Sequence, residues 1–345
     1  MADLQKYFIE FHDDIKLTDE NEELREKRDI ILKKLAQRKA DEVAIYTTFN
    51  QGSYAMNTGV KPVNGDYDID VGIKFDINKD DYEDPIKVKE WVYNALVGHT
   101  RKVEVRRPCV TVTYQIDGEP AYHVDLAIYS ANNSDNKMYI AKGKQNSTKE
   151  YRKWEVSDPQ TLINLISNKY DDNKDREQFR RVIRYLKRWR DLKFTDSGNS
   201  KPNGIGLTIA AYNLFEINKT TDYFANKTTY NDIEAMKTLV KKIINSFSYE
   251  YRVEEMKFVY RLHVNLLIEP YNDTFEKMTD IQMEDFKSKL ETLRDKLNEA
   301  SLEFDPHEAC KILAEEFGDD FPIPEKADTA DKKRNSFITS SSSAK

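Results

Sequence analysis

The sequence predicts an α+β protein: a first lobe built on a mixed β-sheet, followed by a helical lobe. Three observations predict it. Strand-like runs mix with helical segments up to residue 156, helical spacing dominates from residue 157, and the end of the chain is polar and serine-rich. We therefore expect a first lobe with an N-terminal helix over residues 1–156, a helical lobe over residues 157–323 and a disordered tail over residues 324–345.

The elements of the first lobe follow from the spacing of apolar residues. In order, we expect a helix over residues 21–40, strands over 43–49 and 67–73, a helix over 87–97, and strands over 103–116 and 121–129. The first helix has its apolar positions at Leu24, Ile30, Ile31 and Leu35. Asp117-Gly118 is a strong turn signal, so the last two strands should form a hairpin.

The helical lobe begins at a clear start signal, Ser157-Asp158-Pro159, which combines a capping oxygen with a proline in the first turn. Further helices are expected over residues 179–192, 206–217, 233–247 and 280–300. The run 258–268 fits either a strand or the end of a helix.

The composition is that of a soluble globular chain and excludes several protein classes. Of the 345 residues 33% are charged, 39% are hydrophobic, and no apolar run is long enough to span a membrane. Two cysteines are too few for a disulfide framework or a cysteine-rich zinc site, and they fit a reducing cytoplasm. The net charge of −7 argues against a broad surface for nucleic acid.

Three aspartates carry the functional prediction. Asp68 and Asp70 are two residues apart in a strand-like run, so both carboxylates lie on one face of the strand. Asp125 occupies a second run, with His123, Ala127 and Tyr129 on its face. The opposite face of each run is apolar and should pack in the core. A contact with substrate is one interpretation of His123, and a packed or hydrogen-bonded histidine is the simpler one, which we expect.

A small-residue turn precedes these aspartates. Gln51-Gly52-Ser53 follows an apolar run, and such a turn lets backbone N–H groups and a hydroxyl approach a phosphate closely. A lone Gly-Ser pair is usually only a turn, and a lone Asp-x-Asp is usually a surface feature. Their order here, with a third strand aspartate downstream, predicts a nucleotidyltransferase site in which the three carboxylates hold two Mg²⁺ ions and a nucleoside triphosphate.

A basic helix is the second candidate for nucleotide binding. Eight basic and two acidic residues lie from Arg176 to Lys193, and Arg180, Arg184 and Lys187 share one helical face. A solvated face with salt bridges is the simpler interpretation of such a charge run. Since a triphosphate needs cations, we predict that Lys187 first, and Arg184 next, bind its phosphates.

Taken together, these residues resemble the polymerase-β-like nucleotidyltransferase superfamily. Within it, the chain is similar to the bacterial cyclic-oligonucleotide synthases, the CD-NTases of the cGAS/DncV-like type. The likeness spans residues 49–215 in order. It is carried by Gln51-Gly52-Ser53-Tyr54 with Thr58, Asp68-Ile69-Asp70, His123-Val124-Asp125, Arg152-Lys153-Trp154, Ser157-Asp158-Pro159, Lys187-Arg188-Trp189-Arg190-Asp191 and Gly204-Ile205-Gly206-Leu207.

The resemblance implies two lobes that face each other across an active cleft, and a two-step reaction. Asp68 and Asp70 would hold two Mg²⁺ ions, with Mn²⁺ as an alternative, and Ser53 would contact the phosphates of the donor. Asp125 would complete a metal site and help to activate the attacking ribose hydroxyl. The substrates would be nucleoside triphosphates, ATP and GTP first. The cyclic product would be a messenger in antiphage (CBASS) signalling, read by a separate effector protein.

Two departures from the family limit this likeness. Animal DNA-sensing relatives carry a zinc-binding insertion, and this chain has no cysteine cluster to build one, so double-stranded nucleic acid is not expected as an activator. Some members use serine where this chain has glycine at the start of the 204–207 motif, which removes any hydroxyl contact there.

Other functions compete with cyclic-nucleotide synthesis. A polymerase of RNA ends, a nucleotidyltransferase acting on a small molecule or a protein, and a nucleotide-binding scaffold without chemistry are the alternatives. An RNA polymerase should carry a basic lobe, which the acidic composition disfavours, and a scaffold commonly loses a metal ligand. The tail is hypothesised to bind a regulator.

Overall fold

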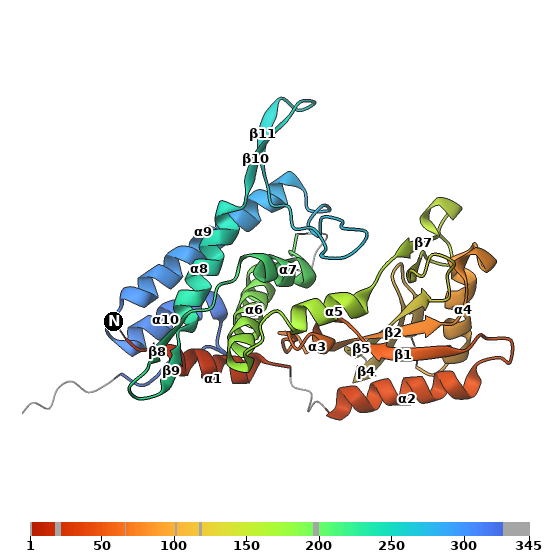
Figure 1. Ribbon diagram of the computed structural model, residues 1–345, viewed down its shortest axis with the longest axis horizontal. Coiled ribbons are helices and arrows are strands. Elements are labelled where there is room, and N and C mark those ends of the chain that lie inside the picture. Colours follow the sequence, from red (N-terminus) through yellow and green to blue (C-terminus); the bar gives the residue numbers. More distant parts are fainter. Residues whose placement is uncertain are drawn as a thin grey trace, which may run out of the picture.

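The computed structural model describes residues 2–17, 22–65, 67–100, 102–116, 119–195 and 200–326. A sheet-based lobe and a helical lobe lie at opposite ends of the molecule (Figure 1). Helix α5 (Pro159–Ser167) lies between them, and α6 (Asn173–Lys193) belongs to the helical lobe. The predicted α+β class, a mixed sheet plus C-terminal helices, is confirmed. Within the described residues no helix combines the length and apolar character needed to cross a membrane.

The sheet has seven strands within the described part of the chain. Its central order is β1-β2-β5-β4-β3; β6 pairs with β5, and β7 pairs with β6. The strands β2 and β5 are parallel, whereas the other pairs are antiparallel. The bounds are β1 (Tyr46–Asn50), β2 (Tyr67–Phe75), β3 (Lys102–Val105), β4 (Val110–Ile116), β5 (Glu119–Ser130), β6 (Tyr139–Lys142) and β7 (Lys153–Val156).

Two helices, α2 (Glu22–Arg38) and α4 (Pro85–Leu96), share an apolar core with the sheet. The alternate residues of β2 and β5 that were expected to face the core are buried there, as the period of two predicted: Ile69, Val71, Ile73, Tyr122, Val124, Leu126 and Ile128. One of the four apolar positions predicted for α2 is wrong, since Ile30 is 37% exposed while the other three are buried.

The helical lobe surrounds α6. Its other helices are α1 (Gln5–Ile15), α7 (Gly204–Leu214), α8 (Asp232–Asn245), α9 (Asp280–Leu302) and α10 (Pro306–Phe317). The helix α1 packs into this lobe through the fully buried Phe8 and Phe11, and Tyr185 Oη donates a hydrogen bond to Phe8 O at 2.7 Å. The predicted first lobe, over residues 1–156, therefore includes a helix, α1, whose apolar face packs in the core of the helical lobe.

Two segments differ from the expected strands. The run 103–116 forms two strands, β3 and β4, which pair with each other across the turn at 106–109. The predicted pairing of β4 with β5 is confirmed, and its turn at 117–118 lies outside the described residues. The undecided run 258–268 is strand β11 (Lys257–Arg261) followed by a loop.

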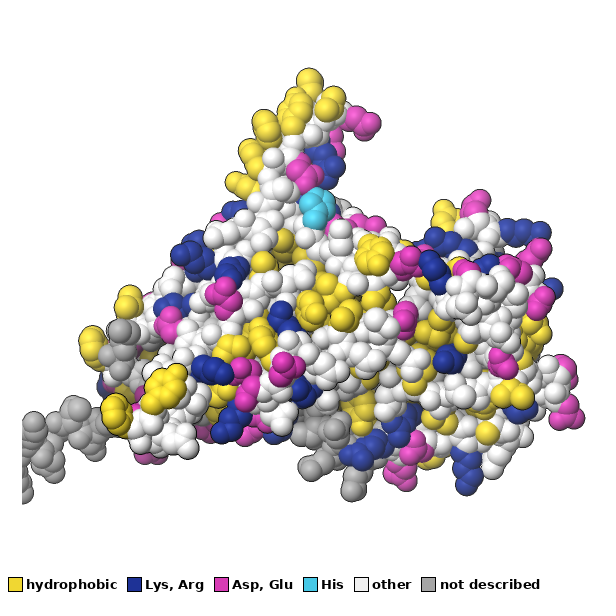
Figure 2. Space-filling model, in the orientation of Figure 1, with side chains coloured by type: hydrophobic (Ala, Val, Ile, Leu, Met, Phe, Trp, Pro, Cys, Tyr) yellow, Lys and Arg dark blue, Asp and Glu magenta, His cyan; other side chains and the backbone are white. Residues whose placement is uncertain are grey.

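Two small hairpins extend from the helical lobe, and the sequence did not predict them. They are β8 (Lys219–Asp222) with β9 (Lys227–Tyr230), and β10 (Ser248–Arg252) with β11. The second projects from the body of the molecule (Figure 1), and Figure 2 shows apolar side chains along it. The exposed apolar residues there are Tyr249, Tyr251, Val253, Met256 and Phe258.

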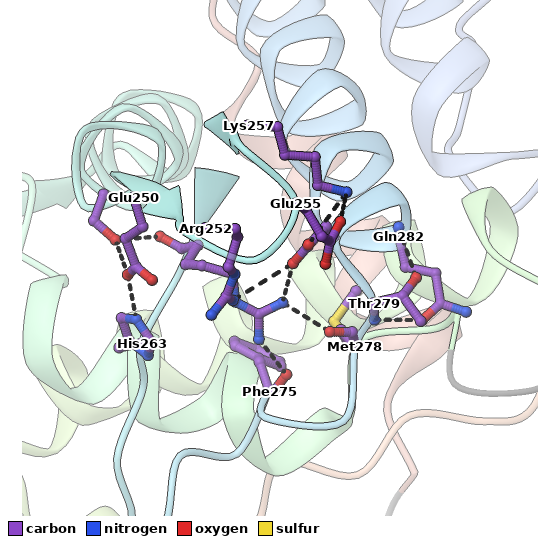
Figure 3. Close-up of polar contacts among 12 residues, drawn as sticks. Glu250, Arg252, Glu255, Lys257, His263, Phe275, Met278, Thr279 and Gln282 are labelled. Carbon is purple, nitrogen blue, oxygen red and sulfur yellow. Dashed lines mark hydrogen bonds and ion pairs between the residues drawn. The ribbon is translucent and has the colours of Figure 1, made fainter. Parts of the chain in front are cut away.

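Polar contacts fix the base of the β10–β11 hairpin (Figure 3). His263 lies 2.7 Å from Glu250 and 2.8 Å from Asp273, and these two contacts raise its pKa. The buried Arg261 donates to Met278 O at 2.7 Å and lies 3.6 Å from a carboxylate oxygen of Asp280. The hairpin is thereby tied to the start of α9.

Candidate active site

The register of β2 and β5 brings the three predicted aspartates together. The two strands run parallel, so that Asp70 pairs with Asp125 and Asp68 pairs with His123. Directly paired residues on neighbouring strands present their side chains on the same face of a sheet. One carboxylate oxygen from each of Asp68, Asp70 and Asp125 lies within 4.8 Å of the others.

The chemistry of this cluster fits a divalent cation. Burial, together with the negative charge of Asp125, raises the pKa of Asp70 to about 6. Grouping carboxylates in a partly buried place is unfavourable unless a cation or protons neutralise them. Oxygen ligands in such a group are the ligands that Mg²⁺ and Mn²⁺ prefer. The three aspartates could therefore hold the ions implied by the sequence.

The predicted turn is the start of the short helix α3 (Gly52–Ala55), which lies against Asp70. The backbone N–H of Gln51 donates to Asp70 O at 3.1 Å. Gly52 has a φ of +68°, and a Cβ added to it would lie 1.9 Å from Asp70 Oδ2. Only glycine lets the backbone approach the carboxylate this closely. The sequence predicted that this turn approaches a phosphate, but it did not predict the contact between Gly52 and Asp70.

A cavity of about 390 Å³ lies beside Asp70, between the sheet and the helical lobe. Its volume is within the usual range for a small-molecule site. The lining comes from both lobes: Gln51, Gly52, Ser53, Met56, Val60, Asp70, Tyr129, Pro159, Leu162, Ile163, Lys187, Arg190, Asp191, Gly204 and Ile205. The structure thus places four of the five residues predicted to bind the nucleotide around one cavity.

The fifth, Arg184, lies outside this lining. Its guanidinium donates to the backbone carbonyls of Asn57 at 2.7 Å and Gly59 at 3.1 Å. These contacts tie α6 to the segment that follows α3. The predicted role of Arg184 in nucleotide binding therefore stays a prediction.

Lys187 is the lysine that reaches the cavity from α6. It is 5% exposed, and its Nζ donates to Thr58 O and to Thr58 Oγ1, each at 3.0 Å. Burial, together with the positive charges of Arg190 and Arg184, lowers its pKa to about 7. An incoming phosphate would favour the charged form of this lysine.

Sequence reasoning missed other residues at the site. Tyr129 lines the cavity, and its hydroxyl donates to Gln51 Oε1 at 2.8 Å. It was placed on the correct face of its strand but given no role, because a partner 78 positions away cannot be found from spacing. His123 meets Thr113 Oγ1 at 3.1 Å, so the expected hydrogen-bonded histidine is confirmed.

A family comparison identifies the sheet lobe. The nucleotidyltransferase domain of the DncV-like cyclic GMP-AMP synthases matches residues 47–129, the segment that contains all three aspartates. Residues 47–129 are thus similar to the nucleotidyltransferase domain of this family. The resemblance stated from the sequence motifs is confirmed, and the domain is a DncV-like nucleotidyltransferase domain.

Two curated relatives are similar over part of the chain. A cyclic GMP-AMP synthase of Escherichia albertii is 28% identical over 169 residues, which are 46% of this chain and 35% of that protein. The cyclic dipyrimidine nucleotide synthase CdnE of Cecembia lonarensis is 31% identical over 176 residues, or 45% of this chain and 56% of that protein. The match thus spans less than two thirds of either relative.

The fold as a whole is similar to a solved CD-NTase. The Vibrio cholerae cyclic AMP-GMP synthase DncV, crystallised with the linear intermediate 5′ pppA(3′,5′)pG, aligns with a TM-score of 0.64. The alignment covers 93% of this chain and 96% of DncV, at 18% sequence identity. Both lobes, and not only the nucleotidyltransferase domain, therefore share the DncV arrangement.

Proposed function

We propose that this chain is a cyclic-oligonucleotide synthase, which joins nucleoside triphosphates into a cyclic di- or trinucleotide and releases pyrophosphate. The observation that carries the proposal is the cluster of Asp68, Asp70 and Asp125 beside the cavity between the lobes. In a chain with a DncV-like nucleotidyltransferase domain, this cluster would supply the metal ligands that nucleotidyl transfer needs.

In this proposal, the aspartates bind the metal ions and the other residues bind the triphosphate. Asp68, Asp70 and Asp125 would hold two Mg²⁺ or Mn²⁺ ions, which when bound stabilise the negative charge of the reacting phosphate. Asp125 would also accept the proton of the attacking ribose hydroxyl. Gln51, Gly52 and Ser53 would hold the triphosphate, and Lys187 would neutralise part of its charge from the opposite wall.

The names of the relatives support a cyclic nucleotide as the product, but they do not indicate its bases. By their names, one curated relative makes cyclic GMP-AMP and the other makes a cyclic dipyrimidine nucleotide. We therefore propose ATP and GTP as the first substrates to test, with CTP and UTP beside them. A role in antiphage (CBASS) signalling through a separate effector is part of the same proposal.

The test is incubation of the full chain with labelled ATP, GTP, CTP and UTP and Mg²⁺, followed by phosphatase treatment. A phosphatase-resistant cyclic product that is lost in Asp68→Asn supports the proposal. Asp76→Asn is the matched control, because Asp76 is an exposed carboxylate one residue beyond β2. A product that persists in Asp68→Asn would contradict the assigned site.

The same experiment separates the alternatives. Long labelled chains would favour a polymerase of RNA ends, and label on an added acceptor would favour a transferase acting on a small molecule or a protein. The proposed regulator of the tail concerns residues that lie, from 327 on, outside the described part of the chain. Deleting residues 327–345 and measuring product in cells tests it, and unchanged synthesis would count against it.

A further inference from the structure

A row of side chains crosses three strands of the sheet at the candidate site. The register pairs Asp70 of β2 with Asp125 of β5, and Asp125 in turn with Thr111 of β4. Because paired residues share a face, Thr111 lies on the same face as the two carboxylates. Its neighbours Val110 and Val112 are fully buried in the core on the other face.

Thr111 contacts Asp125 directly. Its Oγ1 donates to Asp125 Oδ1 at 2.5 Å, and Thr111 is completely buried. A hydroxyl that donates to an ionised carboxylate makes a short, charge-assisted hydrogen bond. Such a bond occupies one oxygen of Asp125 and restricts rotation of its carboxylate.

A buried thiol completes the arrangement. Cys109 is buried, and its Sγ lies 3.4 Å from Thr111 Oγ1. Because the hydroxyl proton of Thr111 goes to Asp125, a hydrogen bond between Cys109 and Thr111 would have the thiol as its donor. Cys109 therefore packs against the hydroxyl that contacts Asp125.

We propose that Thr111 is a positioning residue for the metal site, which fixes the carboxylate of Asp125 so that it binds a divalent cation together with Asp68 and Asp70. This inference rests on the proposed function, because it takes the three aspartates as metal ligands. Hydrogen-bond partners behind metal ligands commonly change metal affinity by about 10- to 100-fold when they are removed.

The test measures Mn²⁺ binding to the nucleotide-free full chain, by the electron paramagnetic resonance signal of free Mn²⁺. Thr111→Val keeps the shape and β-branching of the side chain but removes the donor, and we expect its Kd for Mn²⁺ to rise about tenfold. Thr111→Ala, a second variant without the hydroxyl, should weaken binding similarly. Thr111→Ser keeps the hydroxyl and should restore an affinity near that of the wild type.

Thr113→Val is the matched comparison. Thr113 is two residues further along the same face of β4 and equally buried, but its hydroxyl meets His123 instead of a carboxylate. We expect its Kd for Mn²⁺ to change less than threefold. Equal losses in Thr111→Val and Thr113→Val, or no rescue in Thr111→Ser, would overturn the inference, since packing of β4 would then explain the effect.

The outcomes separate this inference from the proposed function. If Thr111→Val and Thr111→Ala bind Mn²⁺ with the wild-type Kd while Asp70→Asn loses binding, the role of Thr111 is wrong but the metal site remains. Absence of Mn²⁺ binding in the wild type would overturn both. A second readout is the Mg²⁺ concentration that half-activates the reaction, which should rise in Thr111→Val while the KM for the triphosphate stays unchanged.

Discussion

The two walls of the cleft carry opposite charges, and they are built in different ways. On the sheet, two neighbouring strands place three carboxylates within 4.8 Å of one another through backbone register. On α6, most of the cations are held by partners far away in the sequence. Arg181 pairs with Asp232 at 2.6 Å, Arg188 with Asp320 at 3.3 Å and Lys193 with Glu316 at 3.0 Å.

This difference shows what a charge pattern can predict. A pair of residues two apart on a strand has its geometry fixed by the backbone, so the pattern specifies where the side chains meet. A run of cations on a buried helix specifies only that partners are needed, because unpaired buried charge is unfavourable. Which cation remains available for a ligand depends on the tertiary structure. Four predictions test this contrast.

The largest effect is expected at Arg181, on the helical wall. Arg181 donates to both carboxylate oxygens of the fully buried Asp232, and Arg181→Met leaves that carboxylate without its cation. We expect a loss of about 3–5 kcal/mol in the free energy of unfolding. Urea denaturation measures it, with Lys174→Met, an exposed cation on the same helix, as a control expected to change stability by less than about 0.5 kcal/mol. A similar stability for the two variants would show that the basic helix is a solvated face after all.

Gly52→Ala tests the sheet wall without removing a charge. The new Cβ would lie 1.9 Å from Asp70 Oδ2, so the carboxylate must move away from its partners. Displacement of a reacting group by about 1 Å lowers rates by about 100-fold, and we expect that loss of nucleotidyl transfer in the folded protein. Gly98→Ala is the matched control, since Gly98 has a φ of +75° but open space around its Cβ position. Equal activity in the two variants would contradict a fixed position for Asp70.

Lys187→Met and Arg184→Met compare two cations of one helix. Lys187 lines the cavity, whereas Arg184 bonds to backbone carbonyls outside it. Removing a charged contact to phosphate should raise the KM for the triphosphate about tenfold in Lys187→Met. In Arg184→Met we expect a change below threefold and a lower thermal stability. An equal rise in KM for both variants would support the sequence prediction that Arg184 also binds the nucleotide.

The smallest effect concerns the stability of the metal-free protein, which the charges of the acidic cluster lower. The pKa of Asp70 is raised to about 6 in the folded protein, so its stabilising contribution is present below about pH 4 and is lost as the pH rises through 6. In EDTA above pH 6, Asp70→Asn should therefore be more stable than the wild type, by on the order of 1–2 kcal/mol. The difference should vanish near pH 4 and shrink when Mn²⁺ is added. Thermal unfolding from pH 4 to 8 measures it, and a less stable variant at pH 7 would contradict the prediction.

The sequence alone determined which face of each strand carries the aspartates, and the class of the fold. The period of two in residues 67–73 and 121–129 placed the core residues and the three carboxylates on opposite faces, as the structure has them. The start signal at Asp158 was correct as well: its side chain caps α5, and Pro159 follows in the first turn. These features are local, because the backbone alone relates residues two to four positions apart.

Only the tertiary structure decided the rest. In it, α1 packs in the helical lobe, and Gly52 lies against Asp70. The hydroxyl of Thr111 donates to Asp125, and Lys187, not Arg184, lines the cavity. Each of these contacts joins residues that are not neighbours in the sequence. Their geometry depends on how whole strands and helices pack, and the spacing of residues along one element contains no information on which distant side chain it will meet.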